Sequence, residues 1–444
     1  MTGRHRGVRR RVVVLSAVAA LAAGGCSLPG SAGESSPVAV ESAARAVDAG
    51  SGVWDATALH TISVEVDDDA VAEMIATYQS SGEKEWLEAT VTIDGERVER
   101  AGIRLKGNSS LRGVSDDSDP SDLPWLLRLD KFVDDQTVDG WSELVVRSNS
   151  TETALNEAVA LDLLAEAGLA SEHAVSAAFS VNGTEARLRL VVQNLDERWE
   201  AENFSTAGLL YKSEAGGDWS YRGDDPAAYE DVFDQETGED DLTPLIEFLD
   251  FLNTSSDEDF ESELSSRLDV KSFARYLAFE DLVDNFDDID GPGNNSFLRW
   301  DSSSGGFTVV AWDHNMAFGG GPVGTGGRGA GFPGDPDGER PGGMPEGMPE
   351  PPGDERPDGA GPGAGGGRGP GGSNVLVERF TAVTEWADLV EQAGAELRAE
   401  LVDSGFAEDA ISARVDVLTD QAGDLVDADT VEEDADAIRQ VLAG

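Results

Sequence analysis

The sequence predicts an α+β fold with a sheet-rich first part and a helix-rich second part. Short segments of alternating hydrophobic and polar residues, with two tight-turn signals, fill most of residues 60–196. Helical spacing of hydrophobic residues dominates from residue 242 onward. Residues 319–373 interrupt that helical part and hold 11 of the 18 prolines. Because such a composition cannot bury a core, we expect a disordered Gly/Pro-rich insertion there.

The N-terminus is typical of an export signal. Residues 1–25 contain five arginines, an apolar run and then small residues, and the run is too short for a permanent membrane span. Cys26, the sole cysteine, follows the small residues as the lipidated cysteine follows them in a bacterial lipobox. We therefore expect a lipoprotein signal peptide, lipidation of Cys26, and a flexible tether over residues 26–55. A simple secretory signal and an unprocessed cysteine are the alternatives.

The charge balance restricts the possible partners. The chain has 32 basic and 87 acidic residues, and loss of the five leader arginines leaves 27 basic residues and a formal charge of −60. Nucleic acid is not expected as a partner, because phosphate binding needs the opposite sign. Solubility or salt adaptation accounts for much of the acidity. Lysine is scarce, so its positions are informative: Lys84, Lys106, Lys131, Lys212 and Lys271.

The sheet-rich part contains two clear hairpins and one prominent helix. Residues 60–66 alternate like a strand, and residues 67–79 have helical spacing. Residues 87–107 are expected to form two strands around an Asp-Gly turn, and residues 175–196 two strands around an Asn-Gly turn. Residues 123–132 and 141–149 resemble further strands, and residues 152–170 form the clearest helix. Residues 200–241 are acidic and show no regular period.

The helix-rich part brackets one more hairpin. Residues 242–253 and 270–286 have helical spacing, whereas residues 296–313 are expected to form two strands. After the insertion, amphipathic helical patterns continue from residue 374 to the end. The insertion therefore interrupts a domain.

One acidic stretch, "DNFDDIDGPGNNSFLRW", is a candidate site. A calcium-binding EF-hand loop needs oxygen ligands at positions 1, 3 and 5, glycine at 6 and glutamate at 12. With Gly291 at position 6, Phe286 falls at position 1. With Gly293 at position 6, Pro292 falls at position 5 and Arg299 at position 12. Neither register fits an EF-hand.

Phosphoryl transfer fits the spacing better. A kinase-type site uses one carboxylate for the acceptor hydroxyl, an amide oxygen five residues later for a metal, and a carboxylate after the next hairpin. Asp290 and Asn295 have that spacing, and Asp313 follows in "WDHNMAFGG". Mg²⁺ prefers such hard oxygen ligands. For the stretch by itself, a solvated acidic loop is an equally good interpretation.

Six motifs make the interpretation more specific. In chain order they are "GIRLKGNSSL", "LPWLLRLDKF", "LNEAVALDLL", "LLYKSEAGGDWSYRG", "DIDGPGNN" and "WDHNMAFGG". Together they resemble the spore-coat CotH family of atypical kinases, from about residue 60 to the C-terminus. The resemblance implies a reduced protein-kinase-like bilobal fold that transfers the γ-phosphate of ATP to Ser/Thr hydroxyls of a protein. It implies a sheet-rich nucleotide-binding lobe over residues 56–241 and a helical catalytic lobe over residues 242–318 and 374–444.

The same resemblance assigns roles to residues of the second lobe. Asp290 would be the catalytic Asp, and Asn295 and Asp313 would bind Mg²⁺ or Mn²⁺. Asn294 and Asn315 are secondary candidates for turn or metal roles.

The nucleotide-binding half matches the family less well. Family members commonly carry a lysine shortly before the strand that ends in Asp-Lys-Phe, where this chain has Asp122. Lys106 and Lys212 are the available cations for phosphate. Glu157 or Asp162, on the predicted helix, could orient such a lysine.

Two other function classes are compatible with the sequence. A nucleotide-binding pseudokinase scaffold is favoured by the missing lysine near Asp122. A non-enzymatic surface or adhesion lipoprotein could use the Gly/Pro-rich insertion to bind a wall polymer or a partner. The leading expectation is an exported kinase on the outer face of the cytoplasmic membrane, with ATP, Mg²⁺ or Mn²⁺, and a protein substrate.

Overall fold

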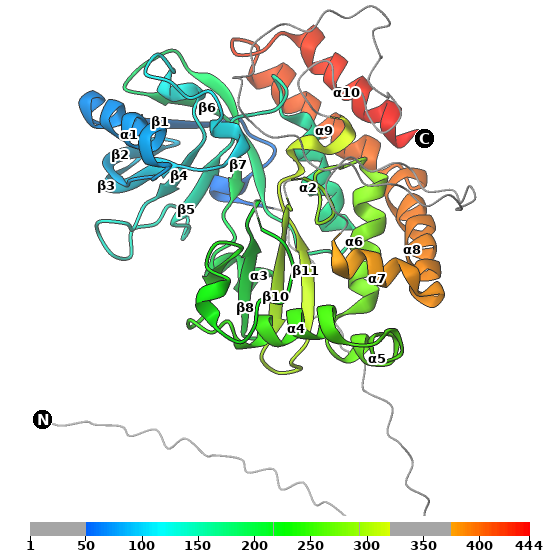
Figure 1. Ribbon diagram of the computed structural model, residues 1–444. Coiled ribbons are helices and arrows are strands. Elements are labelled where there is room, and N and C mark those ends of the chain that lie inside the picture. Colours follow the sequence, from blue (N-terminus) through cyan, green and yellow to red (C-terminus); the bar gives the residue numbers. More distant parts are fainter. Residues whose placement is uncertain (1–49, 216, 293, 320–373) are drawn as a thin grey trace, which may run out of the picture. The chain divides into compact units, whose positions relative to one another are not determined.

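The computed structural model describes residues 50–215, 217–292, 294–319 and 374–444. The predicted leader, Cys26, most of the tether and nearly all of the insertion lie outside the described residues. Within the described ranges, no helix has the length and apolar character needed to cross a membrane. The described chain forms a closed barrel, a four-stranded sheet and a set of helices (Figure 1).

The first sheet is a seven-stranded closed barrel with the order β1-β2-β3-β4-β5-β7-β6. Neighbouring strands are antiparallel, except that β6 closes the barrel by pairing parallel to β1. The strands are β1 (His60–Glu65), β2 (Leu87–Ile93), β3 (Glu96–Leu105), β4 (Trp125–Arg128), β5 (Glu143–Val146), β6 (Ala174–Val181) and β7 (Arg187–Gln193).

Turn chemistry sets the two predicted hairpins of the barrel. Asp94 and Gly95, between β2 and β3, have φ of 49° and 87°, and Asn182 and Gly183, between β6 and β7, have φ of 52° and 71°. A two-residue turn with both φ values positive matches the twist of the flanking strands, and Asx-Gly sequences adopt it most readily. Both predicted hairpins are confirmed.

Hydrophobic side chains from alternate strand positions fill the barrel. Ile62, Val91 and Ile103 are among those fully buried there. Helix α1 (Asp68–Ser81) adds Met74 and Ile75 to this core, and the Asp67 side chain caps its first turn by accepting a hydrogen bond from the Ala70 N–H. The alternation seen in the sequence therefore reflects one face turned into the barrel.

The second sheet has the order β11-β10-β8-β9 and is antiparallel throughout. Its strands are β8 (Gly208–Ser213), β9 (Phe233–Thr237), β10 (Ser296–Asp301) and β11 (Phe307–Ala311). The hairpin of β10 and β11 was predicted, but β8, β9 and the short helix α3 (Glu197–Asn203) were not. β8 has a short buried run, and β9 is an edge strand of mostly polar residues, so neither shows a long period.

The predicted hairpin of the helix-rich part belongs to a larger sheet, to which β8 and β9 contribute from before residue 242. A mixed α+β architecture with sheet-rich and helical parts is confirmed. The kinase-like bilobal arrangement stays a prediction.

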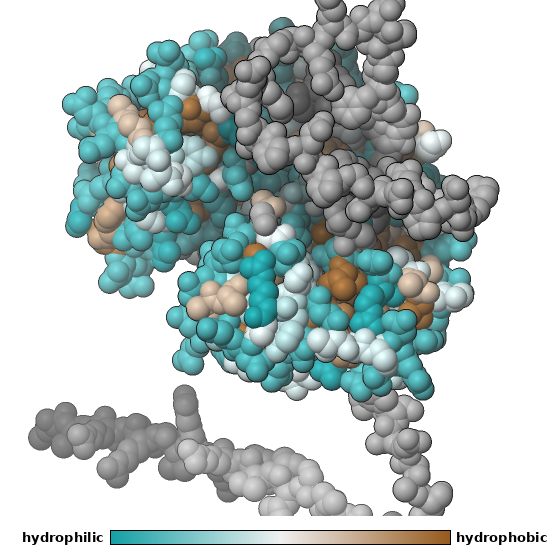
Figure 2. Space-filling view, viewed as in Figure 1, coloured by the Kyte–Doolittle hydropathy of each residue, from teal (hydrophilic) through white to brown (hydrophobic). Residues whose placement is uncertain are grey.

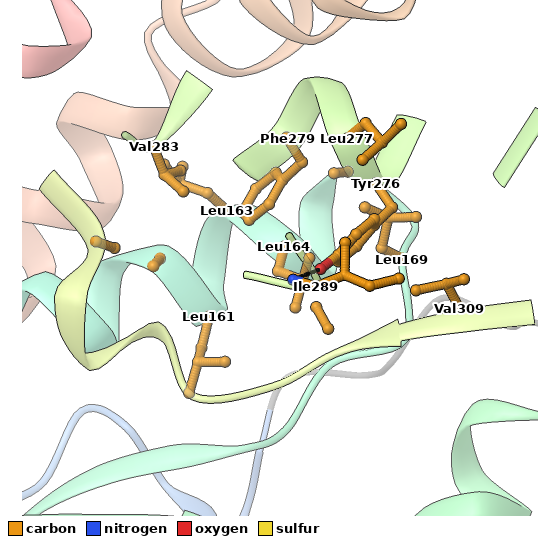
Figure 3. Close-up of a cluster of buried hydrophobic side chains, with 14 of the residues drawn as sticks. Leu161, Leu163, Leu164, Leu169, Tyr276, Leu277, Phe279, Val283, Ile289 and Val309 are labelled. Carbon is orange, nitrogen blue, oxygen red and sulfur yellow. Dashed lines mark hydrogen bonds between the residues drawn. The ribbon is translucent and has the colours of Figure 1, made fainter. Parts of the chain in front are cut away.

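Helix α2 (Leu155–Glu166) joins the helical core although it is encoded between barrel strands β5 and β6. Figure 3 shows Leu163 of α2 beside Phe279 of α6, and Leu164 of α2 beside Ile289. The other helices are α4 (Thr243–Thr254), α5 (Asp257–Glu263), α6 (Val270–Leu282), α7 (Val375–Ala382), α8 (Thr384–Leu397), α9 (Phe406–Gln421) and α10 (Ala428–Leu442).

The surface agrees with the acidic composition. Figure 2 shows that hydrophilic residues cover most of the described face in view, with small hydrophobic patches between them. Among the described residues, Phe132 and Phe286 are the large hydrophobic side chains that are exposed.

Candidate active site

The second sheet gathers three of the predicted site residues at one end. Ser296, the first residue of β10, pairs with Ala311, the last residue of β11. Asn295, just before β10, and Asp313, two residues beyond β11, therefore leave the sheet at the same end. Lys212 on β8 pairs with Phe297 of β10, which puts this cation at that end as well.

Asp313 is joined to helix α2 through an arginine that the sequence analysis did not single out. Arg147 directly follows β5, and its guanidinium binds Glu157 of α2 at both carboxylate oxygens, with distances of 2.7 Å (Nη2 to Oε1) and 3.0 Å (Nε to Oε2). The same Nη2 also donates to Asp313 Oδ1. The side chains of Arg147, Glu157 and Asp313 are 11%, 5% and 25% exposed. One guanidinium thus neutralises two poorly solvated carboxylates.

The two candidate acids of α2 have different partners. Asp162 forms a two-bond ion pair with Arg414 of α9, with distances of 2.6 Å and 2.8 Å, and so ties two helices together. Glu157 is the helix acid at the site, but an arginine pairs with it where the sequence analysis expected a lysine. The sequence feature that could have drawn attention to Arg147 is its position as a charged residue directly after the strand "ELVV".

The two predicted nucleotide-binding lysines have other partners. Lys106 Nζ donates to Asn194 Oδ1 at 3.0 Å, and Lys212 Nζ lies 2.6 Å from Glu214 Oε1. Lys106 nevertheless lies close to the Arg147 group, because both cations lie against Trp312. The Trp312 ring centroid is 5.7 Å from Lys106 Nζ and 5.6 Å from Arg147 Cζ.

Positive charge accumulates around Lys106. Its pKa is lowered to about 8, chiefly by burial; the charges of Lys212 and Arg104 act in the same direction, and those of Glu236 and Glu143 oppose it. Lys84 Nζ donates to the carbonyl oxygen of Gly107 at 2.6 Å. Burial also lowers the pKa of Lys84, with the charge of Lys212 acting in the same direction. In so acidic a chain, this local excess of cations suits a phosphate ligand.

Asp290 lies in the loop between α6 and β10. Asp290 Oδ1 accepts a 2.6 Å hydrogen bond from the backbone N–H of Asn374, the N-cap residue of α7. Its own N–H donates to Asp288 Oδ1 at 2.9 Å. The neighbouring Ile289 N–H donates to Tyr276 Oη of α6 at 3.1 Å (Figure 3). Burial raises the pKa of Tyr276 well above its usual range, so the hydroxyl stays neutral.

The adjacent glycine and asparagines set the shape of this loop. A Cβ on Gly291 would lie 2.5 Å from the Phe286 carbonyl oxygen, so no larger residue fits. Asn294, with φ of 53°, accepts from Trp219 Nε1 at 3.2 Å and serves the turn. Asn295 Nδ2 donates to the Asp287 carbonyl oxygen at 2.9 Å, so Oδ1 is the atom of this amide suited to a cation.

The donor set fits a metal that also binds a nucleotide. Within the described residues there is no group of three or more His, Cys, Asp or Glu side chains that could hold a metal ion. Asp313 and Asn295 offer one carboxylate and one amide oxygen from the same end of the sheet. Mg²⁺ is commonly held by one or two protein oxygens together with substrate phosphates and water, so these two residues suffice.

His314, the residue after Asp313, belongs to a buried group with Glu280 and Asn285. His314 Nε2 is 3.2 Å from Glu280 Oε1, and Asn285 Nδ2 donates to Glu280 Oε2 at 2.9 Å. Burial acts to lower the pKa of His314, but the charge and hydrogen bond of Glu280 outweigh it, and the pKa is raised. Burial also raises the pKa of nearby Glu172 to about 7. These contacts tie the segment after β11 to α6.

Comparison with known proteins identifies the family. The family described as CotH kinase protein matches residues 103–437, three quarters of the chain. This chain belongs to the CotH kinase family. The match runs from β3 into α10 and includes Lys106, Arg147, Glu157, Lys212, Asp290, Asn295 and Asp313.

A curated relative supports the same family. The chain is 25% identical over 195 residues to inner spore coat protein H of Bacillus subtilis (strain 168). The aligned part covers 42% of this chain and 53% of the relative, so the chain spans about half the length of the curated relative it matches.

Proposed function

We propose that this CotH-family chain is an extracytoplasmic kinase that transfers the γ-phosphate of ATP to Ser/Thr hydroxyls of a protein substrate. The observation that carries the proposal is the register of β10 and β11, which brings Asn295 and Asp313 to the same end of one sheet. Their residue types and their order after Asp290 are those of a phosphoryl-transfer site.

The mechanism assigns one task to each of these residues. Asp290, held by the Asn374 N–H, orients the acceptor hydroxyl and accepts its proton as the oxygen attacks the γ-phosphorus. The new O–P bond forms as the bond to the β-phosphate oxygen breaks, and ADP leaves. Asp313 and Asn295 hold the divalent metal, whose chemistry is to neutralise charge on the phosphates. Lys106 and Lys212 add positive charge at the phosphate end.

The first test is transfer of labelled phosphate. The mature chain is incubated with γ-labelled ATP and Mg²⁺ or Mn²⁺, with autophosphorylation and a basic generic protein as acceptors. Asp290→Asn and Asp313→Asn should each lower incorporation by about a hundredfold or more. Asp134→Asn, at an exposed barrel-loop position, is the matched control and should retain full activity.

The same preparations separate the alternative functions. A silent wild type that ATP with Mn²⁺ still stabilises against heat would indicate a pseudokinase scaffold. A silent wild type with no thermal shift would refute nucleotide binding and favour a surface or adhesion role.

The proposal includes a lipid anchor at Cys26. Wild-type protein expressed with its leader should fractionate with the membrane, and Cys26→Ser should be released. Equal membrane association of both would contradict lipidation at this position.

A further inference from the structure

Arg147 is in an unusual electrostatic position. Within the described residues, Arg147 is the side chain that contacts both Glu157 and Asp313. Its side chain is 11% exposed. A guanidinium presents five N–H donors in a planar fork, so it can hold one carboxylate with two of them and offer another donor to a second anion. Arg147 Nε donates to Glu157 Oε2, whereas Nη2 lies 2.7 Å from Glu157 Oε1 and donates to Asp313 Oδ1.

The hydrogen bond from Arg147 and the proposed divalent metal compete for the same carboxylate, that of Asp313. A divalent cation on Asp313 would bring like charge next to the guanidinium and would weaken their attraction. The hydrogen bond to Glu157 would remain, because it uses Nε, which does not contact Asp313. The N–H that Asp313 releases would then be able to donate to a phosphate oxygen.

A kinase-type site needs a cation that a helix-borne acid directs at the phosphates. Glu157 pairs with Arg147. By contrast, Lys106 contacts Asn194, and Lys212 contacts Glu214. Arginine also binds phosphate in two-point geometry. Building on the proposed function, we propose that Arg147 is the helix-directed cation that binds the nucleotide's phosphates, and that it holds Asp313 until the divalent cation takes that carboxylate.

The chain contains a matched control for the structural role of such a pair. Arg414 and Asp162 form a two-bond ion pair on the same helix α2, and Arg414 is buried. Arg414 Nη1 also donates to the Ala174 carbonyl oxygen of β6 at 2.9 Å. Loss of Arg414 therefore reports what the loss of an α2 ion pair does to stability alone.

The test measures binding and needs no turnover. Calorimetry gives the Kd of ATP with Mn²⁺, and paramagnetic resonance of free Mn²⁺ gives the Kd of the metal alone, for wild type, Arg147→Gln, Arg147→Lys and Arg414→Gln. Arg147→Gln should weaken binding of ATP with Mn²⁺ at least about tenfold, the range for hydrogen bonds to charged groups. It should strengthen binding of Mn²⁺ alone, because Asp313 loses its counter-ion. Arg147→Lys should restore most of the nucleotide affinity.

The control and a second variant keep the outcome decisive. Arg414→Gln should lower the melting temperature and leave both Kd values unchanged. If the single variant folds poorly, the double variant Arg147→Gln/Glu157→Gln also removes the charge of Glu157, so that this buried carboxylate is not left without a partner. It should show the same loss of affinity for ATP with Mn²⁺.

Two results would overturn the inference, and they can be told apart. If wild type binds ATP with Mn²⁺ and Arg147→Gln binds it equally well, Arg147 is only a structural counter-ion and the proposed function stands. If wild type itself does not bind ATP with Mn²⁺, the proposed function and this inference both fail.

Discussion

Lys106→Met tests the electrostatics of the candidate site through protein stability. Burial lowers the Lys106 pKa to about 8, which is 2.5 units below its ordinary value of 10.5. One pKa unit corresponds to about 1.4 kcal/mol, so keeping Lys106 charged in the folded state costs about 3 kcal/mol. Methionine has a similar length and carries no charge.

The sign of the pH dependence follows from proton counting. Below pH 8, folded and unfolded chains both carry the Lys106 proton, so stability does not change with pH on its account. Between pH 8 and pH 10.5 the unfolded chain binds one proton more than the folded chain. Folding stability of the wild type therefore rises with pH across this window, by about 3 kcal/mol in total from this residue.

Urea unfolding at intervals from pH 7 to pH 10.5 provides the assay. The free energy of unfolding of the wild type, minus that of Lys106→Met, should increase by about 3 kcal/mol over the window. Lys106→Arg stays charged throughout, so its free energy of unfolding should lack the same rise. A difference between wild type and Lys106→Met that stays constant with pH would refute the reasoning.

Three further predictions concern the residues that support the site. Arg299 is 1% exposed and pairs with Glu200 and Asp301. Arg299→Met should lower the free energy of unfolding, measured by thermal unfolding, by about 3–5 kcal/mol, because the buried acids lose their partner; a loss under 1 kcal/mol would contradict this. Gly291→Ala should lower phosphate incorporation by up to about a hundredfold through displacement of the loop. At Gly394 the nearest atom is 3.9 Å from the new Cβ, so Gly394→Ala should instead add about 0.5–1 kcal/mol to the free energy of unfolding. An equal loss of phosphate incorporation in the two glycine variants would refute the steric argument. Asn294→Ala should lose about 1–2 kcal/mol more than Asn294→Gly in urea unfolding, because its φ of 53° suits glycine; the reverse order would exclude backbone strain.

Local chemistry made much of the fold predictable. The Asx-Gly turns specify their hairpins because only a few residues accept two successive positive φ values. The long hydrophobic period of residues 152–170 predicted α2, and the pattern after residue 374 predicted the C-terminal helices. The residues of the Asp290 loop and of the Asp313 strand end were also identified in the sequence, because the residue types and spacing of phosphoryl transfer are short-range features.

Partners far apart in sequence were not predictable in the same way. Nothing local indicated that β8 and β9 complete a sheet with β10 and β11, since sheet pairing is decided by which edges meet in space. The choice between Glu157 and Asp162 depended on how α2 is rotated against its neighbours, and the leucines of α2 settle that rotation by packing into the helical core.

Local sequence patterns predicted most helices, strands and turns, though not β8, β9 or α3, and they identified the candidate residues around Asp290 and Asp313. Which charged side chains contact one another became known from the fold. Arg147 is 10 residues from Glu157 and 166 residues from Asp313, yet one guanidinium binds both. That contact exists because strands β5 and β11 end close to the first turn of helix α2. The poorly solvated carboxylates there need a shared cation.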